Sequence, residues 1–251
     1  MPLNNFTAGN GSFIELQSTE STNNYAMGLI KQGLAQHGSA CFAHCQTNGK
    51  GQRGKQWLSN PGENIALSVI VDITEVLPLN QFVFNTAIAV SCYNFYKKYA
   101  IDEVAIKWPN DLYWRDRKAA GILIENNYKG SLWQWAVIGV GININQTTFN
   151  VAGKKPVSLK QITGKSFDCV TLAKELQLEI MEGISSIKYN NTNIVHTYNN
   201  VLFKKDEQQV FKKNNEQFTA IVQGVNIDGQ LQLNYNGQLL TLNHGDAEWI
   251  I

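Results

Sequence analysis

Charged, amide and aromatic side chains are concentrated in one short segment of the chain, residues 107 to 118. Within it, Asn110 and Asp111 follow directly on Pro109, whose ring fixes its own φ and biases the residue before it toward an extended conformation. A turn of three charged residues then sends the chain back along a second strand that begins near Lys118. We therefore expect the Asp111 carboxylate and the Lys118 ammonium to flank one cleft of a catalytic pocket.

A second group of candidate residues forms a glycine-rich basic loop, residues 49 to 57, directly after an apolar run that ends near Gln46. Glycines allow backbone N–H groups to approach a phosphate closely, and Lys50, Arg53 and Lys55 supply positive charge beside them. The spacing is not that of a Walker A loop, because no Gly-Lys-Ser or Gly-Lys-Thr follows. The loop is suited to wrapping an anion, although its composition is equally typical of a solvated surface loop.

Two further glycines, Gly139 and Gly141, lie in the β-branched run of residues 138 to 145. They do not form a dinucleotide-binding fingerprint, because the third glycine is missing and the β-branched residues continue where a helix should begin. Glycines inside a strand instead allow a ligand or another backbone to approach closely. Asn143 in this run offers an amide for a base edge, and a purely structural role at a strand end is equally consistent with the sequence.

Composition limits the classes of partner. A net charge of +1 over 251 residues gives no general attraction to nucleic acid or to an anionic membrane, so any anion site must be local. No apolar stretch approaches the length needed to cross a membrane, and residues 1 to 5 lack the basic and apolar regions of a signal peptide. Four cysteines without a repeating spacing fit a reducing compartment. We therefore predict a cytoplasmic protein.

One cluster, Cys41, His44 and Cys45, has residue types that bind metals. In a strand, the two cysteines share one face and His44 points to the other, so a single strand cannot gather the three ligands. We interpret the cysteines as ordinary buried thiols and expect no metal site built by the protein alone.

The apolar periodicity predicts an α+β fold with a mixed, largely antiparallel sheet flanked by helices. Ser21 or Thr22 is a suitable N-cap for the first helix, and Gly33 is its stop signal. The connections between the later strands are too short for crossover helices, which favours antiparallel pairing. Helices are expected over residues 23–32, 79–100, 169–187 and 195–201, and strands over residues 39–46, 64–73, 103–107, 111–114, 118–126 and 132–145.

From about Lys204 the pattern changes to short apolar runs separated by turn signals. The runs are residues 218–222, 231–233 and 239–242, and Asp228-Gly229 is one of the turns between them. This pattern predicts a small C-terminal β-barrel packed against the main domain. We therefore expect two domains, residues 1–203 and residues 204–251.

In sequence order, five segments resemble motifs of the biotin protein ligase family, the biotin-[acetyl-CoA-carboxylase] ligases. The resemblance extends from about residue 15 to residue 145 and implies a class II synthetase-like catalytic domain followed by an SH3-like barrel. The five segments are Ser21-Thr22-Asn23, Gln46 with the basic loop after it, Lys107-Trp108-Pro109-Asn110-Asp111, Lys118-Ala119-Ala120-Gly121-Ile122-Leu123, and residues 138 to 143.

The resemblance implies an ATP-dependent ligase. Such enzymes join biotin to AMP, release pyrophosphate, and pass the biotinyl group to one lysine of a biotin carboxyl carrier protein, a subunit of acetyl-CoA carboxylase. Mg²⁺ would be bound through the ATP phosphates and not by a protein cage. Some members carry an N-terminal DNA-binding domain, for which 20 residues before Ser21 leave no room, so we expect no DNA binding and no repressor activity. Monomer and homodimer both stay open, and residues 132 to 144 are one possible sheet edge for an interface.

The resemblance also implies roles for individual residues. Lys118 would hold the biotin carboxylate and the α-phosphate, and Asp111 would orient the carrier lysine; these two are the catalytic residues. The expected biotin-binding residues are Ser21, Thr22, Asn23, Gln46, Lys50, Gly51, Gln52, Lys118 and Gly121. The expected ATP and adenylate-binding residues are Lys50, Arg53, Gly54, Lys55, Trp57, Asn110, Lys118 and Asn143.

The basic loop departs from the family pattern at three positions. Gln52 stands where the family commonly has arginine, and Lys50 and Lys55 stand where arginine is frequent. Lysine keeps the charge but not the bidentate fork of arginine. We therefore expect phosphate enclosure to depend more on backbone amides and on magnesium.

Two other interpretations compete with a biotin ligase. A lipoate protein ligase shares the fold and the adenylation chemistry, and it has the Lys107 to Asp111 element in related form; the Ser21 element, Gln46 and the basic loop favour biotin. A nucleic-acid-binding or ligand-binding module on the C-terminal barrel belongs to another class. The near-neutral charge argues against that module.

Overall fold

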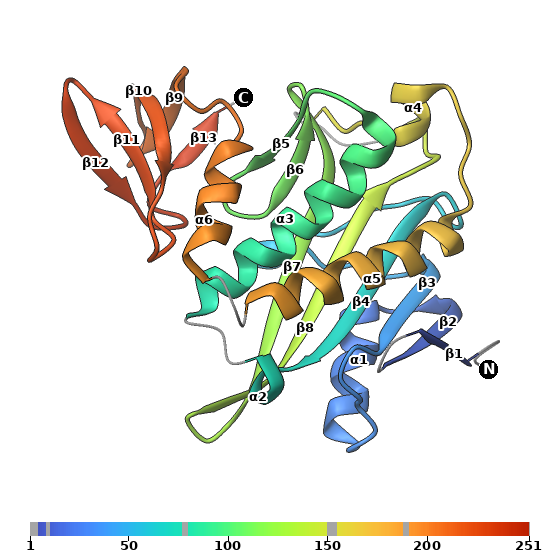
Figure 1. Ribbon diagram of the computed structural model, residues 1–251. Helices are drawn as coiled ribbons and strands as arrows, with labels where there is room; N and C mark the ends of the chain where they lie inside the picture. Colours follow the sequence, from blue (N-terminus) through green and yellow to red (C-terminus); the bar gives the residue numbers. More distant parts are fainter. Residues whose placement is uncertain (1–4, 9–10, 77–79, 150–154, 188–190, 251) are drawn as a thin grey trace.

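The structure, a computed structural model, describes the chain except residues 1–4, 9–10, 77–79, 150–154, 188–190 and 251. Its main part is an eight-stranded sheet with the order β1-β2-β3-β4-β8-β7-β6-β5 (Figure 1). The strands are β1 (Asn5–Ala8), β2 (Gly11–Thr19), β3 (Ala40–Gln46), β4 (Asn64–Asp72), β5 (Val104–Lys107), β6 (Asp111–Trp114), β7 (Arg117–Lys129) and β8 (Leu132–Asn143).

The predicted mixed, largely antiparallel sheet is confirmed. Among the strands in the described part of the chain, only β2 and β3 pair in parallel, and the helix α1 (Thr22–Lys31) forms the crossover between them. The later strands follow one another through short turns and pair antiparallel. Neither β1 nor β2 is among the strands that the sequence predicts.

Strand β8 lies between β4 and β7, so it is paired along both sides. The prediction that residues 132 to 144 offer a sheet edge for a dimer interface is therefore wrong. Hydrophobic periodicity identifies a buried strand but does not say how many neighbours it has.

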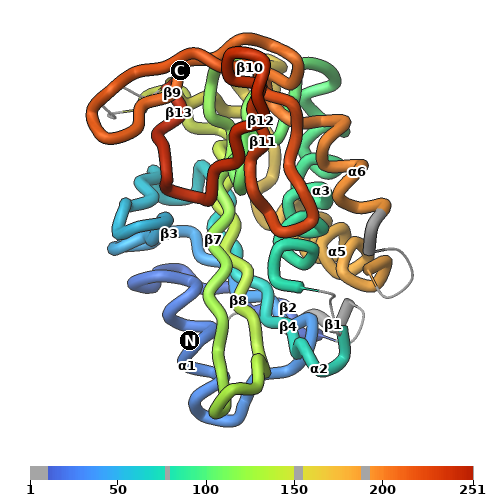
Figure 2. The backbone as a smooth tube through the Cα atoms, turned by 90° about the vertical axis from the view of Figure 1, so that its left-hand side faces the viewer, coloured from blue at the N-terminus to red at the C-terminus, as the bar shows by residue number. Residues whose placement is uncertain are grey.

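Helices cover the two faces of the sheet, and alternation along β8 shows which residues face which helices. The side chains of Ile138 and Val140 belong to the core cluster that includes α3 and α5, whereas Val137 packs in a smaller cluster with Ala26 of α1. Figure 1 shows α3 and α5 lying across one face of the sheet, and Figure 2 shows α1 on the other side of β7 and β8. The helices after α1 are α2 (Ile73–Val76), α3 (Gln81–Ala100), α4 (Leu159–Thr163), α5 (Cys169–Ile187) and α6 (Asn191–Asn200).

Local sequence explains where several helices begin. Asn80 accepts a hydrogen bond from the backbone N–H of Val83 and caps α3. Ser158 and Gln161 form a reciprocal capping box on α4, a helix that the apolar periodicity does not predict. Helix α6 includes residues 195 to 200 of the segment predicted to be helical and ends one residue before Val201. Among the described residues, no helix is both long and apolar enough to cross a bilayer.

The predicted C-terminal β unit is a five-stranded antiparallel sheet with the order β12-β11-β10-β9-β13. Its buried side chains belong to the same hydrophobic cluster as those of α3 and α5, and Phe203 packs against Trp249. The division at residues 203 and 204 stays a prediction. The strands are β9 (Gln208–Lys213), β10 (Glu216–Val225), β11 (Leu231–Tyr235), β12 (Gln238–Leu242) and β13 (Glu248–Ile250).

Candidate active site

Three glycines form a bare patch, the glycine floor, on the face of β7 and β8 that α1 covers. Gly121 pairs with Gly141, and Gly139 lies two residues further along β8, so the three share one face. A β-carbon at Gly139 would lie 2.3 Å from the Asn23 side-chain oxygen, and one at Gly141 would lie 2.4 Å from the Trp57 ring. The glycines therefore make room for an amide and an indole, in agreement with a strand that allows close approach and not with a dinucleotide fingerprint.

One end of the glycine floor is a buried polar group at the start of α1. Ser21, Thr22 and Asn23 are all less than 5% exposed. The backbone N–H and hydroxyl of Thr22 donate to Oε1 of Gln46 at 2.8 and 3.1 Å. The Ser68 hydroxyl lies 2.6 Å from Asn23 Oδ1 and 2.7 Å from Thr22 Oγ1. Ser21 occupies the N-cap position but its side chain makes no capping hydrogen bond, so the purely structural role considered for it is not used here.

Glu125 joins this polar group to the basic loop. Its carboxylate accepts a hydrogen bond from Asn23 Nδ2 at 2.7 Å and lies 3.4 Å from the ammonium of Lys50. Glu125 shares the face of Gly121 because it is four residues further along β7. The carboxylate therefore fixes the Asn23 amide and offers Lys50 a partner.

The other end of the floor carries the predicted pair of charged residues. Lys118 Nζ lies 2.6 Å from Asp111 Oδ2, with about a quarter of each side chain exposed. A β-bulge places both on the same face: Leu112 pairs with Ala120 but Tyr113 pairs with Lys118, which leaves one extra residue on β7. Without that extra residue, strict alternation would turn Lys118 to the opposite face. The structure thus brings the two predicted side chains together as expected, and the cleft between them and their roles stay predictions.

Amide side chains hold the backbone around this pair. Asn110 donates to the carbonyl of Ile122, and the backbone N–H of Ile122 donates back to the Asn110 carbonyl at 3.1 Å. Asn143, which is buried, donates to the Lys118 carbonyl at 3.3 Å. In this conformation both side-chain amides are therefore hydrogen-bonded to the backbone of the protein. For Asn143 this is the structural role that the sequence analysis considered.

The basic loop is folded back on itself as a small hairpin. The backbone N–H of Gly51 donates to the Lys55 carbonyl at 2.7 Å, and that of Trp57 donates to the Gly49 carbonyl at 2.9 Å. A single turn of residues 52 to 54 forms its tip. The loop therefore has a hairpin conformation with residues 53–56 exposed, and both interpretations drawn from its composition stay open.

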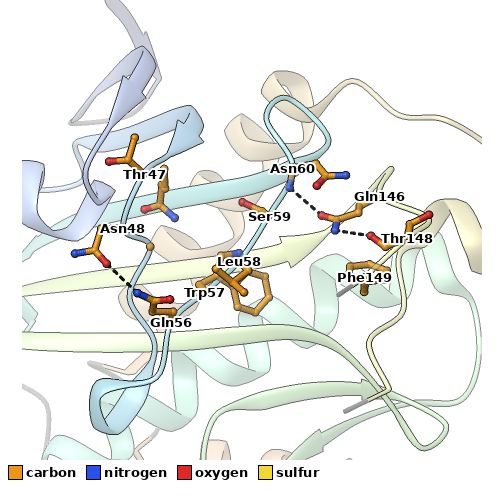
Figure 3. Close-up of a pocket in the computed structure, with 12 residues that line it drawn as sticks. Thr47, Asn48, Gln56, Trp57, Leu58, Ser59, Asn60, Gln146, Thr148 and Phe149 are labelled. Carbon is orange, nitrogen blue, oxygen red and sulfur yellow. Dashed lines mark hydrogen bonds between the residues drawn. The ribbon is translucent and has the colours of Figure 1, made fainter. Parts of the chain in front are cut away.

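A cavity of about 190 Å³ lies beside the loop, between residues 46–60 and residues 146–149 (Figure 3). It is smaller than the roughly 300–1,000 Å³ typical of ligand sites. The Gln146 amide bonds to the backbone of Asn60 and of Thr148 across it, and Trp57 and Phe149 line its wall. Neither residue of the charged pair lines this cavity, so it adjoins the candidate reaction centre and does not contain it.

Comparison with known proteins shows which family this chain resembles in sequence and fold. The model of the biotin/lipoate A/B protein ligase family matches residues 15–143, about half of the chain. The chain belongs to this family. The chain is 36% identical over 172 residues to the bifunctional ligase/repressor BirA of Escherichia coli, which covers 68% of this chain and 52% of that protein. It is 32% identical over 158 residues to the biotin–[acetyl-CoA-carboxylase] ligase of Paracoccus denitrificans, covering 61% of this chain and 65% of that one.

The first of these matches spans about half the length of the curated relative. In fold, the chain is similar to a biotin protein ligase from Aquifex aeolicus solved in complex with biotin and ATP, with a TM-score of 0.80 and 21% identity over 94% of this chain and 97% of that one. Both the sheet and the C-terminal unit therefore follow an architecture found in this family.

Several positive charges surround the charged pair of this family member. Burial lowers the pKa of Lys107; Lys118 and Lys55 lower it further, and Asp111 opposes them. The Lys107 ammonium also lies over the rings of Tyr113 and, in the C-terminal sheet, Trp249. An anion entering here would meet ammonium groups that are partly desolvated and therefore weakly screened.

No group of three or more His, Cys, Asp or Glu side chains in the described part of the chain has the geometry of a metal site. His44 bonds to Glu15 at 2.8 Å and packs its ring against Phe42, on the face opposite Cys41. Burial raises the pKa of the Cys41 thiol to about 12, as expected of a buried structural cysteine.

The structure brings most of the predicted residues to one face of β7 and β8 and separates a few. The exposed loop-tip residues include Arg53, whose guanidinium donates to the His244 carbonyl in the C-terminal sheet at 2.8 Å. In this conformation the Arg53 guanidinium is therefore bound to the C-terminal sheet and is not positioned for its predicted contact with the nucleotide. The residues gathered along the glycine floor are Ser21, Thr22, Asn23, Gln46, Lys50, Trp57, Asn110, Asp111, Lys118, Gly121 and Asn143, and the loop-tip residues are Gly51, Gln52, Arg53, Gly54 and Lys55.

Three residues with contacts in the site were not predicted from the sequence: Ser68, Glu125 and His244. Lys107 lies in a segment that the sequence singled out, but no role was predicted for it. Glu125 had a usable signal, because a carboxylate at the end of the apolar run of β7 needs a polar partner. Ser68 and His244 had no such signal in the sequence, since their hydrogen-bond partners are 46 and 191 residues away.

Proposed function

We propose that this protein is a biotin protein ligase, which converts biotin and ATP to biotinyl-5′-AMP and pyrophosphate and then transfers biotin to a lysine of a carrier protein. The observation that carries the proposal is the pairing of a buried hydrogen-bonding group with a Lys–Asp pair at the two ends of one glycine floor. The Asn23 amide lies above Gly139 and the Lys118 ammonium lies near Gly121, two residues further along the sheet. Along the strand direction, that separation is about 7 Å, which is comparable to the length of a short acyl chain.

The chemistry of the buried end supports biotin over lipoate. The ureido ring of biotin has two N–H donors and one carbonyl acceptor, whereas the dithiolane ring of lipoate has neither. Ser21 and Thr22 present hydroxyl groups with almost no access to water, and the partly exposed Gln46 side chain accepts hydrogen bonds from Thr22 beside them. Such groups favour a ligand that forms hydrogen bonds with them, because a ligand that cannot leaves them unpaired at a cost of about 1–3 kcal/mol each.

In the first half-reaction, attack of the biotin carboxylate on the α-phosphate brings two anions together. The Lys118 ammonium reduces that repulsion and stabilises the negative charge that develops in the transition state. Backbone N–H groups of Gly49 to Gly54, with Lys50 and Lys55, enclose the phosphates. Mg²⁺ held by the ATP phosphates would supply further charge neutralisation.

In the second half-reaction, a carrier lysine must lose a proton before its amine attacks the adenylate carbonyl. The amide bond forms as the bond between the carbonyl carbon and the phosphate oxygen breaks and AMP leaves. The Asp111 carboxylate is the acceptor placed for this task, because it lies 2.6 Å from Lys118 at the reacting end of the floor. The Trp57 indole and the Asn143 amide would contact the nucleotide. The carrier would be a biotin carboxyl carrier protein or a similar biotin-accepting domain, with the protein acting in the cytoplasm as a monomer or a homodimer.

The test is ATP–pyrophosphate exchange by the purified protein with biotin or lipoate as the acid. We expect exchange with biotin alone, and none with biotin for the Lys118→Ala variant. Exchange with lipoate alone would refute biotin as the substrate while keeping the adenylation chemistry. No exchange with either acid would refute the ligase proposal.

A further inference from the structure

The contact between the basic loop and the C-terminal sheet has no task in the reaction proposed above. Arg53, at the tip of the loop, has φ 55° and ψ 42°, in the left-handed region that residues with a β-carbon rarely adopt. Its Nη2 donates to the main-chain carbonyl of His244 at 2.8 Å, across 191 residues of sequence. Unfavourable backbone conformations of this kind persist where surrounding contacts hold them.

The turn that receives Arg53 is shaped for the guanidinium. Gly245 has a φ of 102°, and a β-carbon on it would lie 1.7 Å from Nη2 and 2.6 Å from Cζ of Arg53. The guanidinium therefore occupies the space above a bare α-carbon. Any side chain at position 245 would move the Arg53 head group away from the His244 carbonyl.

The same turn is itself anchored to the predicted reaction centre. The backbone N–H of Asn243 donates to Asp246 Oδ2 at 2.8 Å, and that of Asp246 donates to the Asn243 carbonyl at 3.0 Å, which closes the turn. The His244 ring packs edge-on against Trp108 with 5.7 Å between ring centroids. Trp108 in turn donates its indole N–H to the Gly229 carbonyl at 3.0 Å. The turn is thus fixed to the segment that carries Asp111.

We propose that Arg53, His244 and Gly245 form a latch by which the C-terminal sheet holds the basic loop in its hairpin conformation before a nucleotide binds. Arg53 is then a positioning residue, and its guanidinium acts on the loop and not on a phosphate. Ordering a free loop costs conformational entropy at the moment of binding, and the latch lowers that cost because the loop is already ordered. The identity of the ligand rests on the proposed function, whereas the latch itself does not.

Two variants open the latch in different ways. Gly245→Ala expels the guanidinium while keeping Arg53, and Arg53→Asn removes it while keeping a residue type that tolerates the left-handed region. Gly237→Ala is the matched control, because Gly237 has a φ of 83° in another turn of the same sheet and nothing within 4 Å of its added β-carbon. It brings similar backbone strain without touching Arg53. Arg53→Asn also covers the case in which Gly245→Ala does not fold.

Hydrogen exchange of the loop amides tests the latch without any activity. The N–H groups of Gly51, Lys55 and Trp57 all donate within the loop. We expect their exchange to quicken roughly three- to tenfold in both latch variants, the effect of losing one exposed charge-assisted hydrogen bond, and to be unchanged in Gly237→Ala. Wild-type exchange rates at these amides in both latch variants would overturn the proposal.

Kinetics test the consequence for binding. We expect both latch variants to raise the KM for ATP several-fold, and the double variant to behave as either single variant does. A KM for ATP that is unchanged or lower would overturn the latch, because the loop would then gain nothing from being held. If the wild-type protein shows no biotin-dependent pyrophosphate exchange, the proposed function fails and hydrogen exchange alone decides on the latch.

Discussion

Replacing Ser68 by alanine is expected to weaken both the fold and biotin binding. Ser68 is fully buried on β4, and its hydroxyl lies within 2.7 Å of both Thr22 Oγ1 and Asn23 Oδ1. Thr22 keeps its hydrogen bonds to Gln46 in the variant, and Asn23 keeps its amide N–H bond to Glu125, so the network loses one member and does not collapse. One buried acceptor left unpaired costs about 1–3 kcal/mol.

We take about 1.5 kcal/mol for this loss, which lowers the melting temperature of a chain of this size by roughly 3–6 °C. Looser positioning of Thr22 should also raise the KM for biotin by up to about tenfold while the KM for ATP stays constant. Thermal unfolding and pyrophosphate exchange measure the two effects. Ser91→Ala is the matched control, because Ser91 is a buried serine whose hydroxyl donates within α3 to Ala87. A change in biotin KM no larger than that of Ser91→Ala would refute the role given to the buried polar group.

Three other outcomes follow from the site. Lys118→Ala should reduce biotin-dependent pyrophosphate release by at least about 100-fold, and near-normal release would contradict its role in adenylation. Gly141→Ala places a β-carbon 2.4 Å from the Trp57 ring, so the ring must leave the glycine floor. The near-ultraviolet circular dichroism signal should therefore change, and ATP binding should weaken. If neither changes, the Trp57 ring does not lie on the glycine floor. Burial, and then the charge of Arg53, hold the pKa of His244 below its ordinary 6.5. An imidazole that resists protonation in the folded state takes up its proton more readily when unfolded, so its contribution to stability falls as the pH drops below 6.5 toward the folded-state pKa. NMR titration should show that low pKa and its rise in Arg53→Asn, and a His244 pKa that does not rise in that variant would contradict the contact.

The parts of the fold that the sequence predicts are those fixed by local pattern. The 20 residues of α3 are buried on most sides and bounded by a cap at Asn80, so they read as one helix without any tertiary information. Strands β5 to β8 follow one another through tight turns, and adjacent hairpins define their own pairing. The order of strands is different, because the placement of β8 between β4 and β7 depends on which distant segment closes the sheet, and no periodicity records that choice.

The same distinction runs through the candidate site. Lys118 and Asp111 are seven residues apart on neighbouring strands of one hairpin, so their proximity follows from the turn between them. Even here the sequence alone does not show why they share a face, which requires the extra residue of the bulge. Ser68 and the Arg53 contact depend on register across many strands, and their residue types are ordinary at those positions. The residues that carry charge are thus found from local sequence, whereas the residues that hold those charges in place emerge only from the folded chain.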